Sequence, residues 1–495
     1  MTATPSKVVW VCFLHLYQPA NQAKDIFQRV VSESYRPLVN HLLENPTIKI
    51  TLNISGALTE QLIEHKCQDV IDGFRQASER GQIEFTDSAK FHALLPFLSD
   101  QEIKRQITLN RETNAKYFGH SYKPQGFFPP EMGYSTRLAP ILDEMGYQWV
   151  ILDEIALNGK VEQLDSHTTY KIKNTNLYAF FRERVPSNLI MSALIRQVSD
   201  FEGIRDFYQK GYFITGMDGE TFGHHRPGLD TLLTGLLLSP KMEHAFLSDL
   251  PNLFPKVEEV TPVDSTWAST EKDIETGVQF LTWKDPQNEI HTWLWELQNL
   301  ALQTVAERPQ STDSRQKLDA ALASDHFFWA SARPWWSIEM IETGAWQLLD
   351  VIENVPSVEN QKERARYLYQ KIIAKAFEWQ RSGRIKEIYA DYRETPRVPF
   401  KDRTVGSGEP WVYDAFIQFI RQEMKKAAEK ENFEEATLWR DAIWKLETKN
   451  DIYDAVHAVD LLRKRLDEGE IYQMIDKYRQ EYEKVASGQP ESRGN

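Results

Sequence analysis

The segment Tyr212-Phe-Ile-Thr-Gly-Met-Asp218 joins a mainly apolar run directly to an acidic residue. An earlier segment has the same form, because Val8-Val-Trp-Val-Cys-Phe-Leu14 is followed by His15. Such near-continuous apolar runs are typical of strands in a parallel sheet, both faces of which are covered by helices. Both segments therefore predict buried parallel strands that carry polar side chains at their carboxyl ends.

Similar runs recur through the first half of the chain, with helical patterns between them. We predict strands at residues 8–14, 48–54, 83–86, 126–128, 149–152, 177–181, 189–193 and 212–217. We predict helices at residues 27–44, 57–80, 100–118 and 136–146. Strands that alternate with helices in this number favour an α/β fold with a closed or nearly closed barrel of parallel strands.

Four polar residues fall at or just after the predicted strands: His15, Glu84, Glu131 and Asp218. In barrels of this kind, the reactive groups lie at the carboxyl ends of the strands. We therefore expect these four side chains on one face of the barrel. Two alternatives stay open: each acid caps the helix after its strand, or His15 and Glu84 satisfy each other as a buried polar pair.

The second half of the chain changes character and predicts separate regions. We expect a barrel domain at residues 1–288 and a helical domain at 289–390. Residues 391–410 contain three prolines and two glycines and predict a linker or extended loop. Residues 411–495 predict a charged helical tail.

Composition limits the class of protein. Apolar residues make up 41% and charged residues 26% of the 495 residues, as in ordinary soluble globular proteins. The net charge of −14 argues against nucleic acid or an anionic membrane as a partner. Two cysteines imply no disulfide framework, and a short, polar N-terminal segment predicts no signal peptide, so we expect a cytoplasmic protein. No glycine-rich nucleotide motif is present, and we predict no cofactor.

Two acids stand in unusual surroundings. Glu131 lies in Gly126-Phe-Phe-Pro-Pro-Glu-Met-Gly-Tyr134, and Asp218 stands between a hydrophobic strand and Gly219. An apolar setting removes water from a carboxylate and raises its pKa towards values that suit proton transfer. Glycoside cleavage requires two such groups, one to attack the anomeric carbon and one to protonate the leaving oxygen.

Five short motifs follow one another in the chain: His15-Leu-Tyr-Gln-Pro19; Gly81-Gln-Ile-Glu84 with Phe91-His-Ala-Leu-Leu-Pro96; Gly126-Phe-Phe-Pro-Pro-Glu131; Met217-Asp-Gly-Glu-Thr-Phe-Gly-His224; and Ala323-Ser-Asp-His-Phe-Phe-Trp329. Their types and order resemble those of glycoside hydrolase family 57. The fifth departs from the family pattern, which usually places Trp after the Asp, where this chain has His326.

The resemblance implies an incomplete (β/α)7 barrel followed by a helical bundle that completes the active site. It implies a retaining hydrolase or transglycosylase that acts on α-glucans or maltooligosaccharides, most often α-1,4-linked, with Glu131 as nucleophile and Asp218 as general acid/base. The two carboxyl groups should then lie about 5–5.5 Å apart. It also places His15, Glu84 and Asp325 on sugar hydroxyls, with His224 and Trp329 as further candidates. For Trp329, packing in the helical core is an equal alternative.

The tail carries a second resemblance. Residues 424–446 include Phe433, Ala436, Leu438, Ile443 and Leu446 at helical spacing, with Asn432 near a turn. This pattern resembles the UVR motif, a helical hairpin used for contacts between proteins. It implies a protein partner for the tail, and the alternative is a hairpin that packs on its own barrel.

Two other functions stay open. A metal-dependent polysaccharide deacetylase has a similar barrel, but it requires an Asp and two well-spaced His ligands, whereas His224 and His225 are adjacent. A barrel without activity could instead serve as a glucan-binding scaffold. The sequence does not distinguish hydrolysis from transfer, because both use the same covalent intermediate.

Overall fold

A computed structural model of the protein describes residues 7–191, 201, 209–226, 228–333, 335–392, 410–448, 473 and 477. Contacts divide the chain into two compact units, residues 1–191 with 195–392 and residues 192–194 with 393–495. The predicted barrel and helical regions fall in the first unit. The predicted linker at 391–410 and the tail beyond 448 lie almost entirely outside the described residues.

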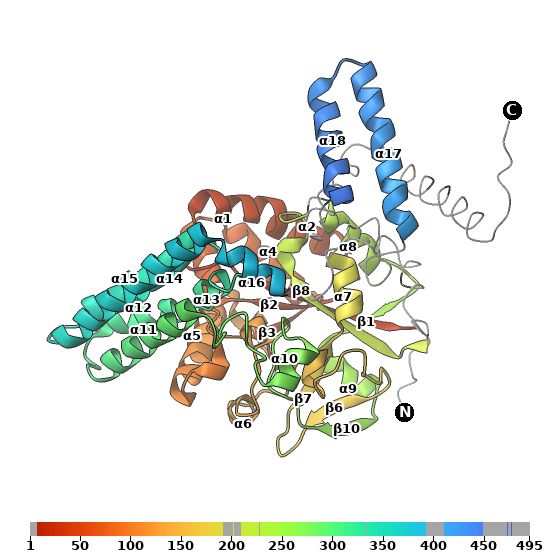
Figure 1. The fold of residues 1–495 in the computed structure, drawn as a ribbon. Helices are drawn as coiled ribbons and strands as arrows, with labels where there is room; N and C mark the ends of the chain where they lie inside the picture. Colours follow the sequence, from red (N-terminus) through yellow and green to blue (C-terminus); the bar gives the residue numbers. More distant parts are fainter. Residues whose placement is uncertain are drawn as a thin grey trace, which may run out of the picture. The chain divides into compact units, whose positions relative to one another are not determined.

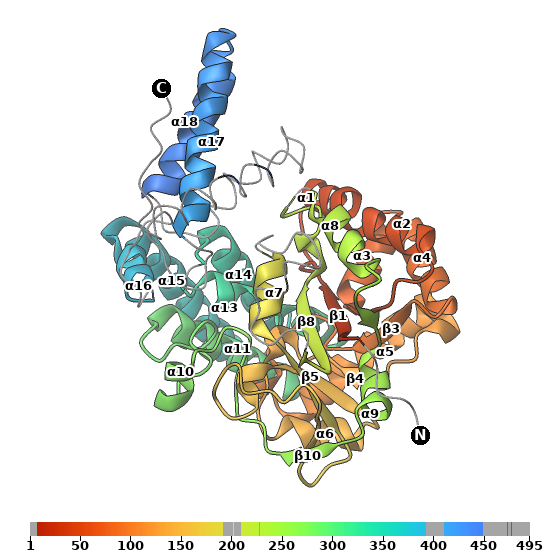
Figure 2. The ribbon, with the colours of Figure 1, turned by 90° about the vertical axis from the view of Figure 1, so that its right-hand side faces the viewer.

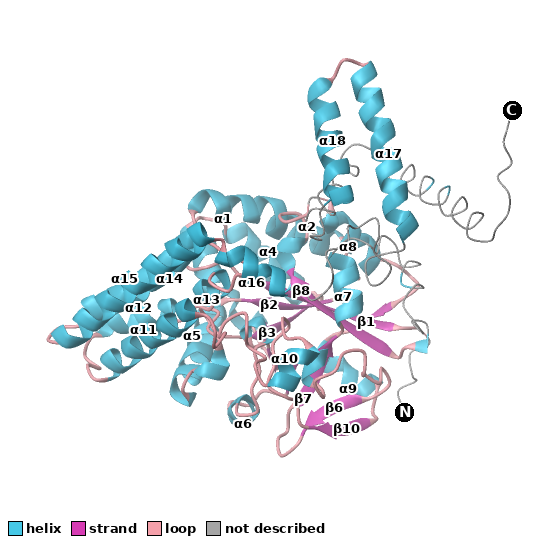
Figure 3. Ribbon diagram, in the orientation of Figure 1, coloured by secondary structure: helices cyan, strands magenta, loops and turns pink. Residues whose placement is uncertain are grey.

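The first unit is built on one sheet (Figure 3). Within the described residues, seven strands run parallel in the order β8-β1-β2-β3-β4-β5-β7. They are β1 (Val9–Leu16), β2 (Ile50–Ile54), β3 (Ile83–Asp87), β4 (Gly126–Phe127), β5 (Trp149–Asp153), β7 (Tyr178–Arg182) and β8 (Tyr212–Asp218). Beyond β7, the strand β6 (Thr169–Ile172) runs antiparallel to it and pairs with β10 (Val257–Val260), while β9 (Glu243–His244) pairs with β1.

The barrel is open between β7 and β8, which share no ladder in the described part of the chain. Two single hydrogen bonds join these strands instead. The backbone N–H of Glu183 donates to the carbonyl of Ile214 at 2.8 Å, and Arg182 Nε donates to the carbonyl of Gly216 at 2.6 Å. The predicted incomplete (β/α)7 barrel is therefore confirmed.

Helices connect the strands and surround the sheet (Figure 1). They are α1 (Lys24–Val30), a π-helical turn (Val31–Tyr35), α2 (Arg36–Glu44), α3 (Gly56–Glu64), α4 (Gln68–Glu79), α5 (Asp100–Phe118), α6 (Leu138–Glu144), α7 (Arg184–Met191), α8 (Leu229–Leu237), α9 (Leu250–Leu253) and α10 (Glu271–Thr276). The single helix predicted at 57–80 is two helices, because the chain turns between them with Lys66 at φ 61°.

The strand predicted at residues 189–193 is wrong over its described part, which forms the end of α7. The apolar run there faces inward at helical spacing, with Pro186, Ser187 and Ile190 buried. A short apolar run cannot be assigned from periodicity alone, and the chain after β7 must leave the sheet through a helix before it can return as β8.

A helical region follows the barrel within the same unit. It comprises α11 (Glu289–Ala306), α12 (Thr312–Ala321), α13 (Asp325–Trp329), α14 (Ile338–Glu353), α15 (Glu359–Ser382) and α16 (Arg384–Tyr392). Helices α11, α12, α14 and α15 pack side by side (Figures 1 and 2). A bridge between Ala93 and Ala323 attaches the start of α13 to the loop after β3. This attachment brings the fifth motif to the barrel.

The second unit contains a hairpin of α17 (Pro410–Glu429) and α18 (Phe433–Thr448). Asn432 lies at the turn, as predicted, and its side-chain oxygen accepts from the backbone N–H of Glu435. Trp439, Ala442, Ile443 and Leu446 are buried at helical spacing on α18. Phe433 and Leu438, from the same pattern, are 67% and 46% exposed. Among the described helices, none is both long and apolar enough to span a bilayer.

Candidate active site

Glu131 occupies a strained turn directly after β4. It has φ 61° and Met132 has φ 47°, values that residues other than glycine seldom adopt. Pro129 and Pro130 precede the turn and restrict its backbone. Backbone strain of this kind is concentrated at functional sites, because the surrounding structure must hold it in place. The turn fixes Glu131, whose side chain is buried, at the carboxyl end of the barrel.

One side chain donates directly to this carboxylate. Trp267 Nε1 lies 2.9 Å from Glu131 Oε2, and the backbone N–H of Trp267 donates to the Glu131 carbonyl at 3.2 Å. The other oxygen, Oε1, lies 3.7 Å from His92 Nδ1. Burial raises the pKa of Glu131 well above its ordinary value, the charges of Asp218 and Asp325 raise it further, and the Trp267 hydrogen bond opposes the change.

Asp218 is the last residue of β8 and sits opposite His15 in the ladder with β1. Burial raises the pKa of Asp218 to about 6, against the lowering effect of the Arg182 charge. Arg182 itself is buried and held by Asp153 at 2.8 Å. Burial thus raises the pKa of both acids, and the charge of Asp218 disfavours ionisation of Glu131.

The segments that carry these two acids approach each other across the barrel. A side chain added at Gly216, two residues before Asp218, would place its first carbon 3.2 Å from the methyl carbon of Met132, the residue after Glu131. The rings of Phe128 and His15 are 4.5 Å apart. The separation of about 5–5.5 Å between the two carboxyl groups stays a prediction.

His15, at the end of β1, belongs to a chain of polar contacts that ends at the helical region. Its Nδ1 lies 2.8 Å from Asn53 Oδ1, and its Nε2 lies 3.2 Å from His92 Nε2. His92 in turn lies 3.1 Å from Ser324 Oγ. Burial lowers the pKa of His15 to about 4, so its ring is neutral at pH 7. A neutral ring offers one donor and one acceptor, and its hydrogen-bond partners set the tautomer.

Asp325 enters from the first turn of α13. The hydroxyl of Tyr17 donates to Asp325 Oδ2 at 2.7 Å, and the Tyr17 ring stacks on His92 with centroids 4.2 Å apart. Burial raises the pKa of Asp325 to about 6. The charge of Asp325 also raises the pKa of Glu131, which shows that the helical region contributes to the electrostatics of the site.

Glu220 accepts hydrogen bonds that hold the loop after β1. Its Oε1 accepts from the backbone N–H of Tyr17 at 3.1 Å and from the Tyr35 hydroxyl. Burial raises the pKa of Glu220 to about 7, and the charge of Asp218 adds to this shift. Glu220, in the fourth motif, thereby positions the loop that contains Tyr17 of the first motif.

Glu84 does not join the other three residues, and its predicted place at the carboxyl end is wrong. It is the second residue of β3, two positions before Thr86, which pairs with Asn53. Its Oε2 accepts from Thr51 Oγ1 and from the backbone N–H of Leu247, both at 3.1 Å. The alternative that His15 and Glu84 satisfy each other is wrong as well, because each has other partners.

The two weaker candidates occupy other surroundings. His224 Nδ1 lies 2.6 Å from Glu33 Oε2, on the π-helical turn. Trp329 packs edge-on against Phe328 and Trp335, with centroids 5.6 and 5.7 Å away. The contact of both residues with substrate stays a prediction.

Several residues of the site were not predicted from the sequence. Trp267 lies 136 positions after Glu131 on a loop without a recognisable motif. Tyr17 and His92 lie within the quoted motifs, but the sequence does not tell which motif residues face inward. Arg182 ends β7, and its position after an apolar run is the one signal that could have identified it.

Comparisons with known proteins identify a family for this chain. The model of the glycosyl hydrolase family 57 matches residues 7–261, more than half of the chain. The chain belongs to this family. The UvrB/UvrC motif matches residues 414–449, and the resemblance of the tail to that motif is confirmed.

Relatives of this family 57 protein carry different names. An α-amylase from Pyrococcus horikoshii is 27% identical over 148 residues, which are 30% of this chain and 23% of the relative. A 4-α-glucanotransferase from Thermococcus litoralis is 26% identical over 148 residues, 30% of this chain and 22% of the relative. The matched segments thus span less than a quarter of these relatives.

Among solved structures, a family 57 branching enzyme from Thermococcus kodakaraensis has a TM-score of 0.56 at 16% identity. The superposition covers 81% of this chain and 99% of the branching enzyme. At this identity, the similarity shows that the fold is shared beyond the barrel.

Replacing Trp267 with Phe tests the hydrogen bond to Glu131 in this family 57 protein. The substitution keeps an aromatic ring and removes the donor that favours the ionised carboxylate. A hydrogen bond to a charged group contributes about 1.5–3 kcal/mol, so we expect kcat/KM to fall by roughly 10–100-fold. The acid limb of the pH–rate profile should move to higher pH, because the pKa of Glu131 rises further. An unchanged acid limb would contradict this role for Trp267.

Proposed function

We propose that this protein cleaves α-glucans, α-1,4-linked chains in the first place, by double displacement with retention of anomeric configuration. One observation carries the proposal: Glu131 and Asp218 are desolvated and electrostatically coupled at the carboxyl end of one barrel. The names of the relatives, an α-amylase and a 4-α-glucanotransferase, support the substrate class.

In the first step, a carboxylate oxygen of Glu131 attacks the anomeric carbon while the glycosidic C–O bond breaks. Asp218 gives its proton to the departing oxygen. In the second step, Asp218 takes a proton from water or from a sugar hydroxyl, and that oxygen attacks the anomeric carbon. The ester bond to Glu131 breaks and the carboxylate is restored.

This cycle needs one proton on the pair, and the electrostatics favour that state. Two carboxyl groups that interact electrostatically resist double ionisation, so we expect the pair to titrate as a unit that keeps one proton over a range of pH. The Trp267 N–H favours the ionised form of Glu131. Positive charge that develops at the anomeric carbon favours the same form, so the mechanism requires the proton on Asp218 when the glycosidic bond breaks.

Polar groups around the pair are suited to hold sugar hydroxyls. His15 is neutral and Asp325 is fixed by Tyr17, so they offer a donor and acceptors with little reorganisation. We assign His15 and Asp325 to the sugar rings next to the cleaved bond. We assign His224 and Trp329 to sugar rings further along the glucan. Glu84 is left out, because its carboxylate is bound at the other end of β3.

The proposal also covers a protein partner for the helical tail and a cytoplasmic location. Phe433, Leu438 and Trp444 are each more than 40% exposed on α18, and exposed apolar side chains of this size suit a protein partner. Cys12 and Cys67 are both free thiols, as suits a cytoplasmic protein.

The deacetylase alternative makes a different demand on the site. Among the residues that the structure describes, no group of three or more His, Cys, Asp or Glu side chains is placed to hold a metal ion. Metal analysis of the purified protein tests this alternative directly, since one tightly bound zinc per chain would favour it.

Product analysis tests the proposed function. We expect maltoheptaose to give α-configured reducing ends in the first minutes, as seen by proton NMR before mutarotation. Products longer than maltoheptaose would identify transfer, and shorter products alone would identify hydrolysis. Initial β-configured products, or no turnover of maltoheptaose, amylose or glycogen, would overturn the proposal.

A further inference from the structure

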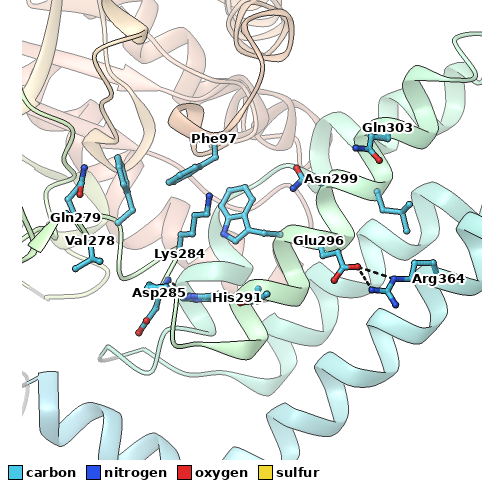
Figure 4. Close-up of a pocket in the computed structure, with 16 residues that line it drawn as sticks. Phe97, Val278, Gln279, Lys284, Asp285, His291, Glu296, Asn299, Gln303 and Arg364 are labelled. Carbon is cyan, nitrogen blue, oxygen red and sulfur yellow. Dashed lines mark hydrogen bonds and ion pairs between the residues drawn. The ribbon is translucent and has the colours of Figure 1, made fainter.

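A pocket of about 830 Å³ lies along α11, and its lining residues differ from those that contact Glu131 and Asp218 (Figure 4). We name it the α11 pocket. Its walls come from the turn that contains Phe97, from residues 277–286, from one face of α11 and from Arg364 on α15. Its volume falls in the range of about 300–1,000 Å³ that is typical of small-molecule sites.

One wall of the α11 pocket is aromatic and firmly held. The rings of Phe97 and Trp295 have centroids 5.1 Å apart, and Phe280 packs edge-on against Phe97 at 5.0 Å. Trp295 Nε1 donates to the Trp283 carbonyl at 2.9 Å, and the Trp295 ring stacks on Phe327 at 4.1 Å. These contacts fix the ring planes before any ligand binds, which lowers the entropic cost of binding.

Polar side chains line the rest of the pocket, and its charged side chains sum to zero net charge. Thr292, Asn299 and Gln303 follow one face of α11 and are exposed. The Glu296 carboxylate is paired with Arg364, and Asp285 is paired with Arg333 at 3.2 Å. Most of the charge at this pocket is therefore already balanced, and the amide groups of Asn299 and Gln303 remain to contact a ligand.

Lys284, a cation in the pocket wall, is engaged by aromatic rings. Lys284 Nζ lies 4.1 Å from the centroid of Phe97 and 5.6 Å from that of Trp295. Figure 4 shows the Lys284 side chain directed towards Phe97. Burial lowers the pKa of Lys284. Such a group suits neutral hydroxyl acceptors better than it would suit a multiply charged anion, which requires several cations.

From these features, we infer that the α11 pocket is a second glucan-binding site that holds a part of the chain remote from the cleaved bond. Sugar rings combine apolar C–H faces, which pack on aromatic planes, with hydroxyl groups, which bond to amides and a lysine. The pocket adjoins the catalytic region through two short connections. Phe97 is five residues after His92, and Trp295 stacks on Phe327, two residues after Asp325.

The inference deepens the proposed function and rests on it for the choice of ligand. The site would raise affinity for long glucans without changing the chemistry, because a chain held at two sites gains an effective local concentration. Short substrates that reach the acids alone would gain nothing.

The test uses the full chain with Asn299→Ala and Gln303→Ala combined, and Thr292→Trp as an independent variant that fills the pocket. Gln370→Ala, an exposed glutamine on α15 that does not line the pocket, is the matched control. Binding is measured by retardation in native gels containing glycogen, and turnover is measured on maltotriose and on amylose.

We expect the double variant and Thr292→Trp to weaken glycogen binding by roughly fivefold or more, since about two hydrogen bonds are lost. Turnover of maltotriose and binding by Gln370→Ala should match the wild type. Equal retardation of pocket variants and control, with maltotriose turnover intact, would overturn the inference. Absence of any turnover by the wild type would overturn the proposed function instead, and weakened glycogen binding by the pocket variants would still support the site.

Discussion

We expect Glu131→Gln to lower kcat on maltoheptaose by on the order of 10⁴–10⁶-fold, the range seen when a covalent nucleophile is removed. The amide is nearly the same size and can accept the Trp267 hydrogen bond, so the site should keep its shape. It cannot attack the anomeric carbon at a useful rate. Initial-rate measurement of reducing ends checks this loss.

Two comparisons make the result specific to the nucleophile. Glu84→Gln is a matched control, because burial also raises the pKa of Glu84, to about 7, but its carboxylate lies at the other end of its strand. We expect Glu84→Gln to retain kcat within a few fold. Azide added to Glu131→Ala should restore turnover of an aryl α-glycoside and give a β-glycosyl azide. An active Glu131→Gln protein would remove Glu131 from the mechanism.

We expect Asp218→Asn to lower kcat/KM on maltooligosaccharides by about 10²–10⁴-fold, as for loss of a general acid. With an aryl α-maltoside, whose leaving group needs no proton, formation of the glycosyl-enzyme should be nearly normal. The covalent intermediate should then accumulate and appear in mass spectra, because no base activates the second step. Equal losses on both substrates would contradict the acid/base role.

The pH dependence gives the same substitution a second readout. The wild-type acid must be protonated, and burial raises the pKa of Asp218 to about 6. Activity should therefore fall as pH rises above about 6 in the free protein, and this limb should vanish in Asp218→Asn with the aryl substrate.

Thermal unfolding tests whether the lower kcat/KM of Asp218→Asn arises from misfolding. A carboxyl group whose pKa is raised on folding stabilises the protein below its unfolded pKa of about 4, and this contribution is lost as pH rises through about 6. At pH 7, the wild type carries the unfavourable ionised form, whereas Asn stays neutral. Asp218→Asn should therefore have a Tm equal to or a few degrees above that of the wild type at pH 7.

The sequence alone determined the seven parallel strands of the barrel to within a few residues. It also predicted one further strand, at 189–193, whose described part is helical. It also placed His15 and Asp218 near the ends of long apolar runs, and Glu131 shortly after the two-residue strand β4. Strand ends are local features, and a barrel places its carboxyl ends together whatever its loops do. The strand ends that carry these residues could thus be located without knowing any contact between distant residues, whereas the choice of Glu131 and Asp218 as the catalytic pair came from the resemblance to family 57.

Only the tertiary structure decided which groups surround those acids. Trp267 reaches Glu131, Asp325 reaches Tyr17, and Glu84 lies at the opposite end of its strand from the position expected for it. Each of the first two contacts joins residues more than a hundred positions apart, and no periodicity records such pairs. The pKa values of the acids depend on burial and on these neighbours, so the chemistry of the site follows from long-range packing and not from the local pattern.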